Sequence, residues 1–130
     1  MSGLDSIGAL VGRIFLGVIF VLAGFGKFGG LAGTAGFMAS KGFPEALTMP
    51  GALVAAIIEL VCGLMIIVGF QARLAALIVF LFMVPTTLIF HPFATDQVNF
   101  MKNLAIMGGL LIVATQGGGG LSVDSRRAAA

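Results

Sequence analysis

Four long apolar stretches, separated by short polar or glycine-rich segments, make up most of the chain. They cover residues 7–28, 50–69, 73–90 and 98–115. A helix rises about 1.5 Å per residue, so about 20 residues cross the hydrocarbon core of a bilayer, and each stretch is near that length. Because backbone groups in lipid must find their hydrogen-bond partners within the protein, each stretch is expected to be a helix. The pattern therefore predicts an all-α fold, a four-helix transmembrane bundle.

The connections between the stretches predict how these helices are joined. Residues 29–49 form the longest connection, which is rich in glycine and small side chains, and we expect a long loop between helices 1 and 2. Its 35–41 portion has the composition of a short helix at the membrane surface. Residues 70–72 leave room only for a tight turn, so helices 2 and 3 are expected to form an antiparallel hairpin.

The last two segments are polar or glycine-rich. Residues 91–97 join helices 3 and 4 and contain Pro92, which breaks a helix. The tail, residues 117–130, begins with four glycines, and we predict that it is mobile beyond Asp124. The pattern gives no sign of a second domain, so residues 1–130 are expected to form a single membrane domain.

Composition agrees with a membrane protein. Hydrophobic residues make up 59% of the chain and charged residues 9%, and the mean hydropathy is +1.17. A soluble domain has about 25% charged residues, so a chain this poor in charge is expected to face a lipid bilayer. Seven basic and five acidic residues give a net charge of +2, and no basic run is long enough to bind nucleic acid, which we exclude as a partner.

Four spans place both ends of the chain on one side of the membrane. The arginines are expected on that side and the lysines on the other: Arg13, Arg73, Arg126 and Arg127 against Lys27, Lys41 and Lys102. Basic residues are more frequent on the cytoplasmic side of a membrane. We therefore expect a multi-pass protein of a bacterial-type cytoplasmic (inner) membrane, with both termini in the cytoplasm.

One carboxylate interrupts the second apolar stretch. Glu59 lies near its centre, and residues 50–69 hold no other charge. A carboxylate at that depth costs about 2.5–3.5 kcal/mol on insertion scales, so it needs a cation, a water-filled cavity or a proton. Glu59 is therefore the best indication of a site in the chain.

Several cations are expected near Glu59. At the helix rise per residue, Arg13 lies on one side of it in depth, and Lys27, His91 and Lys102 lie on the other. Two interpretations remain open. In one, Glu59 and Arg13 form a buried ion pair that fixes the register of the helices. In the other, Glu59 forms a polar pocket with Lys102 or His91 for a small ligand or a proton. The candidate ligand-binding residues are Glu59, Arg13, His91, Lys102, Asn103 and Lys27.

The rare residues limit the chemistry. Cys62 is the single cysteine, which excludes an intramolecular disulfide and a two-cysteine redox relay, and we interpret it as a packing residue. His91 is the single histidine, which excludes haem ligation by two histidines of one chain. No group of side chains has the spacing of a zinc or iron–sulfur site, so no metal is predicted. No self-contained redox centre or catalytic motif is visible, and whether the chain is an enzyme stays open.

Small residues recur along the helices. Gly8 and Gly12 have GxxxG spacing, and Ala52, Ala56 and Gly63 recur along the second stretch. Such positions let helices approach closely. They favour packing within the bundle, and a homo-oligomer seam is the alternative.

Several segments together resemble the DoxX family of small four-helix membrane proteins. They are RIFLGVIFVLAGFGKF (13–28), GFP (42–44), ELVCGLMIIVGFQAR (59–73), His91, FMKNLAIMGGLL (100–111) and GGGLSVD (118–124). Each segment is weak alone, but their order and spacing extend over nearly the whole chain. By this resemblance, the family's motif positions are Arg13, Gly24, Lys27, Glu59, Gly63, Gly69, Arg73, His91, Lys102 and Asn103. We expect structural roles for Gly24, Gly63, Gly69 and Arg73.

The resemblance implies a four-helix fold and a link to redox chemistry. The family is named after a small membrane subunit associated with quinone-linked thiosulfate oxidation, and other members resemble accessory parts of membrane redox complexes. Quinone is therefore the cofactor or ligand that the resemblance suggests. Other membrane or redox subunits are the partners it suggests.

Three functions are consistent with the sequence. The leading hypothesis is a redox-associated membrane subunit with a pocket between helices, near Glu59, for a quinone or a similar apolar ligand. The alternative is a non-catalytic assembly or scaffold subunit of a larger membrane complex. A small proton pathway or transporter is less favoured, because the chain shows no duplicated halves.

Overall fold

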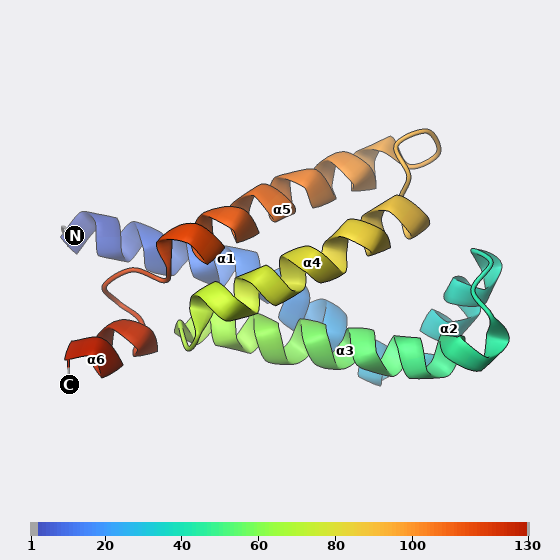
Figure 1. The fold of residues 1–130 in the computed structure, drawn as a ribbon, viewed down its shortest axis with the longest axis horizontal. Helices are drawn as coiled ribbons and strands as arrows, with labels where there is room; N and C mark the ends of the chain where they lie inside the picture. The colour runs from blue at the N-terminus through green and yellow to red at the C-terminus, as the bar shows by residue number, and fades with distance from the viewer. Residues whose placement is uncertain (1–2, 130) are drawn as a thin grey trace.

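The computed structural model describes residues 3–129, which form six helices and no strand (Figure 1). In chain order the helices are α1 (Gly3–Phe28), α2 (Leu31–Ser40), α3 (Glu45–Val68), α4 (Ala72–Phe90), α5 (Gln97–Gln116) and α6 (Val123–Ala129). Among the described residues, α1, α3, α4 and α5 are long and apolar enough to cross a membrane. The predicted all-α, four-helix transmembrane bundle is therefore confirmed.

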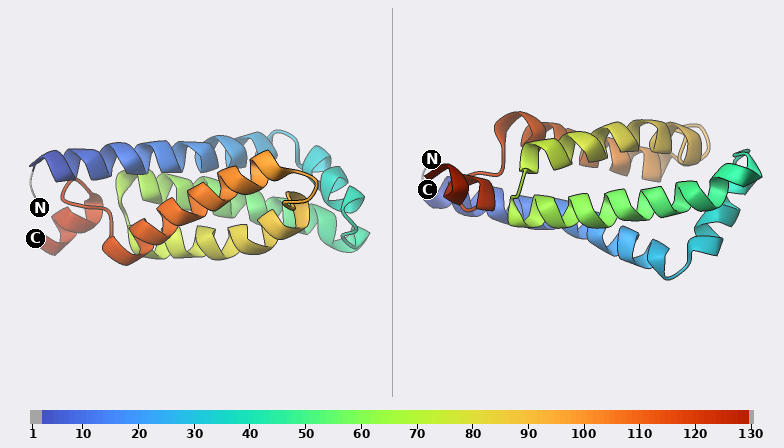
Figure 2. Two further views of the ribbon diagram at one scale, coloured as in Figure 1. Left: turned by 90° about the horizontal axis from the view of Figure 1, so that it is seen from above. Right: turned by 60° about the horizontal axis from the view of Figure 1, so that its bottom comes forward.

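Both ends of the chain lie at the same end of the bundle, as an even number of spans requires (Figures 1 and 2). The tail carries the short helix α6, and Asp124 ties it to the hairpin between α3 and α4. The Asp124 carboxylate accepts hydrogen bonds from the backbone N–H of Gln71, at 2.7 Å, and of Ala72, at 2.9 Å. The mobility of the tail stays a prediction.

The long loop predicted between the first two spans is wrong. Helix α2 occupies its middle, and only short connections remain on either side. The segment LAGTAGFMAS is rich in glycine, which suggested a loop, but Leu, Ala and Met favour a helix. Burial of Ala35 and Met38 adds to that preference, because α2 packs against α3.

The hairpin predicted between helices 2 and 3 is confirmed as the connection between α3 and α4. Helix α3 starts at Glu45, before the expected start at Pro50, so that Pro50 lies inside it. It ends in a left-handed cap at Gly69, with φ of 76°. Gln71 follows with φ of 47°, and α4 starts one residue later. This tight turn makes α3 and α4 antiparallel neighbours.

Glycines bring α1 against α3. A Cβ atom added at Gly24 would lie 2.5 Å from the backbone nitrogen of Leu60 and 2.8 Å from the carbonyl oxygen of Ala56. One added at Gly17 would lie 2.8 Å from the carbonyl oxygen of Gly63. Only glycine permits this approach, because the neighbouring atoms belong to the backbone and cannot move aside.

The apolar core lies along α3, α4 and α5. Its fully buried members include Ile66, Val79 and Leu110, and Cys62 packs among them as a small apolar residue. Figure 1 shows α4 diverging from α3 as both run away from their hairpin turn. The candidate site lies between α3 and α4, at the end of these helices far from the hairpin turn.

Candidate functional site

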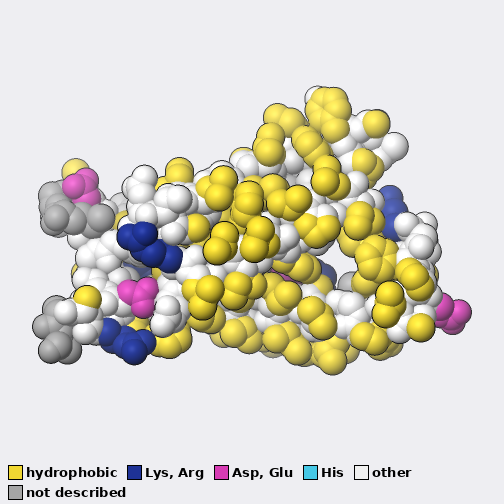
Figure 3. Space-filling model, in the orientation of Figure 1, with side chains coloured by type: hydrophobic (Ala, Val, Ile, Leu, Met, Phe, Trp, Pro, Cys, Tyr) yellow, Lys and Arg dark blue, Asp and Glu magenta, His cyan; other side chains and the backbone are white. Residues whose placement is uncertain are grey.

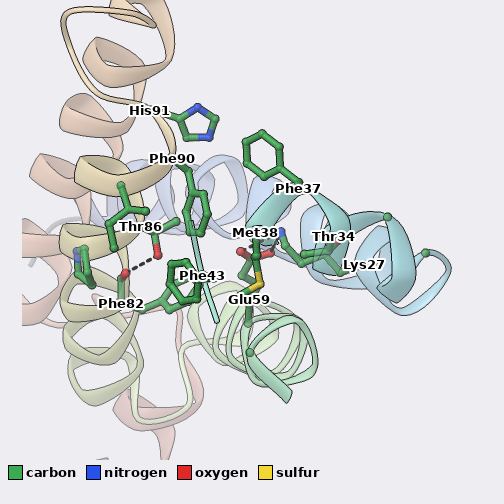
Figure 4. A pocket seen from close by; sticks show the side chains of 16 residues that line it. Lys27, Thr34, Phe37, Met38, Phe43, Glu59, Phe82, Thr86, Phe90 and His91 are labelled. Carbon is green, nitrogen blue, oxygen red and sulfur yellow. Dashed lines mark hydrogen bonds and ion pairs between the residues drawn. The ribbon is translucent and has the colours of Figure 1, made fainter. Parts of the chain in front are cut away.

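A cavity of about 660 Å³ opens between α3 and α4 at the end of the bundle opposite the termini. The end of α1 and helix α2 complete its wall. Figure 3 shows the hollow on the molecular surface, and Figure 4 shows its side chains. The labelled residues of the wall are Lys27, Thr34, Phe37, Met38, Phe43, Glu59, Phe82, Thr86, Phe90 and His91. Ligand sites commonly have a volume of about 300–1,000 Å³ and an apolar wall with a few polar groups, as here.

Lys27 and Glu59 form an ion pair in the wall of this cavity. The ammonium Nζ of Lys27 donates hydrogen bonds to both carboxylate oxygens of Glu59, at 2.8 Å to Oε2 and 3.1 Å to Oε1. The Glu59 side chain is 9% exposed and that of Lys27 is 26% exposed. The carboxylate thus has the cation that its depth requires, and the lysine is the more exposed member of the pair.

Aromatic rings form another part of the wall. The ring centroid of Phe90 lies 5.5 Å from those of Phe37 and Phe43. Phe90 ends α4, Phe37 belongs to α2 and Phe43 precedes α3, so the rings bridge the two sides of the opening. Met38 lies beside the ion pair in Figure 4. This wall suits a flat or branched apolar group better than a hydrated ion.

His91 stands at the rim, in the loop between α4 and α5. Its Nδ1 lies 2.7 Å from Oδ2 of Asp96. The centroid of its ring lies 6.4 Å from the ring centroid of Phe37. The amide of Asn99 donates to both oxygens of Asp96, at 2.9 and 3.0 Å. The hydrogen bonds from Asn99, and then from His91, lower the pKa of Asp96 below its ordinary value of 3.8.

Arg13 does not contact Glu59, so the proposed ion pair between them is wrong. Its guanidinium donates to the carbonyl oxygens of Ile66, at 3.2 Å, Ile67, at 2.9 Å, and Leu121. Ile66 and Ile67 belong to the last turn of α3, where carbonyl groups lack intrahelical donors. Arg13 therefore caps the end of α3, at the opposite end of the bundle from the cavity.

Lys102 and Asn103 lie on α5 and do not line the cavity. Lys102 is exposed, whereas Asn103 is buried and donates to Oγ1 of Thr87 at 3.1 Å. This bond cross-links two helices, α5 and α4. The ligand-binding role of both residues stays a prediction.

Arg73 joins the same two helices at their other end. It lies in the first turn of α4 and donates to the carbonyl oxygen of Thr115, near the end of α5.

The sequence did not identify the aromatic wall. Thr34 and Phe37 are one helical turn apart and face the cavity together, but the short helix considered from the sequence covered only residues 35–41 and left Thr34 in the loop. Recognising the full extent of α2, from Leu31 to Ser40, would have placed them on one face. Phe90 and Phe43 are ordinary apolar residues in the sequence, and only the fold brings them together.

Comparison with known proteins identifies the family. The profile of the DoxX family matches residues 8–92. The chain is 40% identical to the inner membrane protein YqjF of Escherichia coli (strain K12), over 95% of each chain.

This chain belongs to the DoxX family. A second relative, the inner membrane protein YphA of Escherichia coli (strain K12), is 33% identical over 90% of this chain and 88% of its own. The protein named "Putative oxidoreductase CatD" of Bacillus subtilis (strain 168) is 36% identical over 55% of this chain and 51% of its own. No solved structure matches. The chain is thus an integral membrane protein of the DoxX family.

Proposed function

We propose that this DoxX-family protein is a redox-associated subunit of the inner membrane whose cavity binds a quinone or a similar apolar molecule with a carbonyl head group. One observation carries the proposal: an ion pair between a buried glutamate and a half-buried lysine lies in the wall of a mostly apolar cavity. Two relatives named as inner membrane proteins support the location, and the excess of basic residues on the side of the termini, four against three, favours termini in the cytoplasm.

The polar groups of the wall match the head group of such a ligand. A quinone carbonyl accepts hydrogen bonds, and Lys27 has a third N–H beyond the two that Glu59 accepts. The aromatic rings of Phe37, Phe43 and Phe90 supply faces on which a flat ring can stack. His91 stands at the rim, where it can contact a second carbonyl group.

Glu59 gives the site a proton carrier next to the bound head group. Conversion of a quinone to a quinol takes two electrons and two protons. The described residues contain no cluster of His, Cys, Asp and Glu that could hold a metal, and the chain has a single cysteine, so we assign the electrons to a partner protein. The relative named as an oxidoreductase agrees with a redox context. The role of this chain is to hold the ligand and to exchange protons with it through Glu59 and Lys27.

The experiment compares the molecules that co-purify with the protein. Wild type and Glu59→Gln are purified in lipid nanodiscs, and their extracts are analysed by mass spectrometry. We expect quinone enriched over bulk membrane in wild type and at bulk level in the variant. Ordinary lipid in both samples, together with a stoichiometric protein partner, would contradict the proposal and favour the assembly role.

A matched pair of variants controls for indirect effects of the charge change. Gly33 lines the cavity and Gly36 does not, and a Cβ atom added at either position meets no atom within 4 Å. Gly33→Leu is therefore expected to fill the cavity and lose the quinone, and Gly36→Leu to keep it.

A further inference from the structure

A second hollow lies at the opposite end of the bundle, between α1 and α5. It is a groove of about 510 Å³ whose wall is mostly apolar and includes Ala9, Gly12 and Leu16 of α1, and Ile106, Gly109 and Ile112 of α5. In a membrane protein this groove faces the acyl chains of the lipid. Small residues at its base make room for a chain between the two helices.

The groove continues into a polar hollow. Gln116, Gly117 and Gly119 line both the groove and a neighbouring hollow of about 540 Å³, so the two adjoin. Arg73 and Ser125 add polar groups to this second hollow. The four glycines Gly117–Gly120 form a loop, called the glycine loop below. The guanidinium of Arg73 lies over this loop, because a Cβ atom added at Gly117 would be 3.2 Å from its Nε. The combined space is apolar at one end and polar at the other.

A buried cation lies at the junction. Arg13 is 2% exposed, lines the groove, and donates only to carbonyl groups. Among the described residues no hydrogen-bond partner reaches its Nε, and no carboxylate lies within 4 Å of its guanidinium. A charge removed from water is costly unless an opposite charge lies close by. Asp124 attracts the guanidinium electrostatically but does not contact it, so an anion that reaches this junction would add to the compensation of its charge.

We propose that the groove and the polar hollow together bind one anionic phospholipid of the leaflet on the side of the termini. One acyl chain lies in the groove, and the phosphate lies at the glycine loop, between Arg73 and Arg13. The wall of the groove runs from Ala105 to Gln116, which is about 16 Å of helix, and half the hydrocarbon core is about 15 Å. The length of the groove therefore matches one leaflet.

The charges near the polar hollow favour an anionic head group. Arg126 and Arg127 of α6 add to the two arginines at this end. Asp124 also lines the hollow, but each of its carboxylate oxygens already accepts a backbone N–H, from Gln71 and Ala72. A helix of a second copy would bring an apolar surface without a phosphate, so it would add no negative charge near Arg13.

The experiment is native mass spectrometry of the full chain released from nanodiscs of phosphatidylglycerol or phosphatidylcholine. Wild type is expected to retain one phosphatidylglycerol, with an affinity about tenfold above that for phosphatidylcholine. Gly12→Leu fills the groove without a clash, because a Cβ atom at Gly12 meets no atom within 4 Å, and it should lose the lipid. Gly108→Leu, on α5, is equally unobstructed and does not line the groove, so it should retain the lipid.

A second variant tests the head group. Arg73→Gln is expected to retain a lipid but to bind both types equally. Three results would overturn the proposal: equal lipid retention by Gly12→Leu and wild type, no preference for phosphatidylglycerol in wild type, or a wild-type dimer that Gly12→Leu disrupts while neither carries lipid.

Discussion

At the residue scale, the pair of Lys27 and Glu59 gives the cavity its polarity. Replacing Lys27 by Met leaves the Glu59 carboxylate, 9% exposed, without the cation that it contacts. Breaking a buried pair costs roughly 3–5 kcal/mol, and because Lys27 is partly exposed we expect about 1–3 kcal/mol. Thermal unfolding in detergent measures this loss.

A double variant tests whether the Lys27 and Glu59 side chains stabilise each other. Lys27→Met with Glu59→Gln removes the stranded charge, so the double variant should be more stable than Lys27→Met alone. A double variant whose loss equals the sum of the two single losses would show that the two side chains do not interact.

A pH dependence follows from Asp96 at the rim. Hydrogen bonds from Asn99 and His91 lower its pKa in the folded state below 3.8. The stability it contributes is therefore present above pH 3.8 and is lost as the pH falls through the lowered folded-state pKa. Melting temperatures of wild type should fall more steeply than those of Asp96→Asn as the pH is lowered below 3.8. Parallel curves for the two proteins would contradict this.

The sequence identified Glu59 but not its partner. A charge alone in an apolar stretch can be recognised from composition, whereas its partner depends on the register between two helices. Gly24 lies against Leu60, and Gly17 lies against Gly63. This register places Lys27 beside Glu59 and Arg13 at the end of α3. The depths estimated from the sequence assumed that α3 starts at Pro50 rather than at Glu45.

At the element scale, the packing of α1 on α3 depends on glycine. A Cβ atom at Gly24 would meet backbone atoms of Leu60 and Ala56 at 2.5 and 2.8 Å. Gly24→Ala should therefore destabilise the protein by about 1–3 kcal/mol. Gly26→Ala is the control on the same helix, because a Cβ atom there meets nothing within 4 Å. Its effect should be neutral or slightly stabilising, since alanine favours a helix over glycine. Equal effects of the two substitutions on the unfolding temperature would exclude this account.

Helix α6 depends on one carboxylate. Asp124 accepts two backbone hydrogen bonds from the start of α4, and its own N–H donates to the carbonyl oxygen of Gly69 at 2.9 Å. Asp124→Ala should release α6, and trypsin should then cut faster after Arg126 and Arg127. Asp124→Asn keeps one side-chain acceptor and should give an intermediate rate. An unchanged cleavage rate in Asp124→Ala would mean that other contacts hold the tail.

The elements themselves were partly predictable. The four apolar stretches were enough to predict the membrane-spanning helices, because a helix satisfies the hydrogen bonds of its own backbone in lipid. Helix α2 was missed in its extent, because its glycines lower helix propensity and its stability comes from packing against α3, which no local pattern reveals.

At the scale of the whole molecule, the bundle has two different ends. One end holds the cavity with Lys27, Glu59 and His91, and the other holds both termini, Arg13 and the glycine loop. The divergence of α3 and α4 from their hairpin turn makes the cavity, while α2 closes its side. The proposed function of the cavity rests on its shape and polarity, and the sequence alone supplied only the polarity.

The most direct test of the central claim is a calorimetric titration of a short-tailed quinone into the purified protein in detergent. Wild type and Gly36→Leu should bind it, and Gly33→Leu, whose added side chain enters the cavity, should not. Binding by all three proteins with the same affinity, or by none of them, would contradict a quinone site in this cavity.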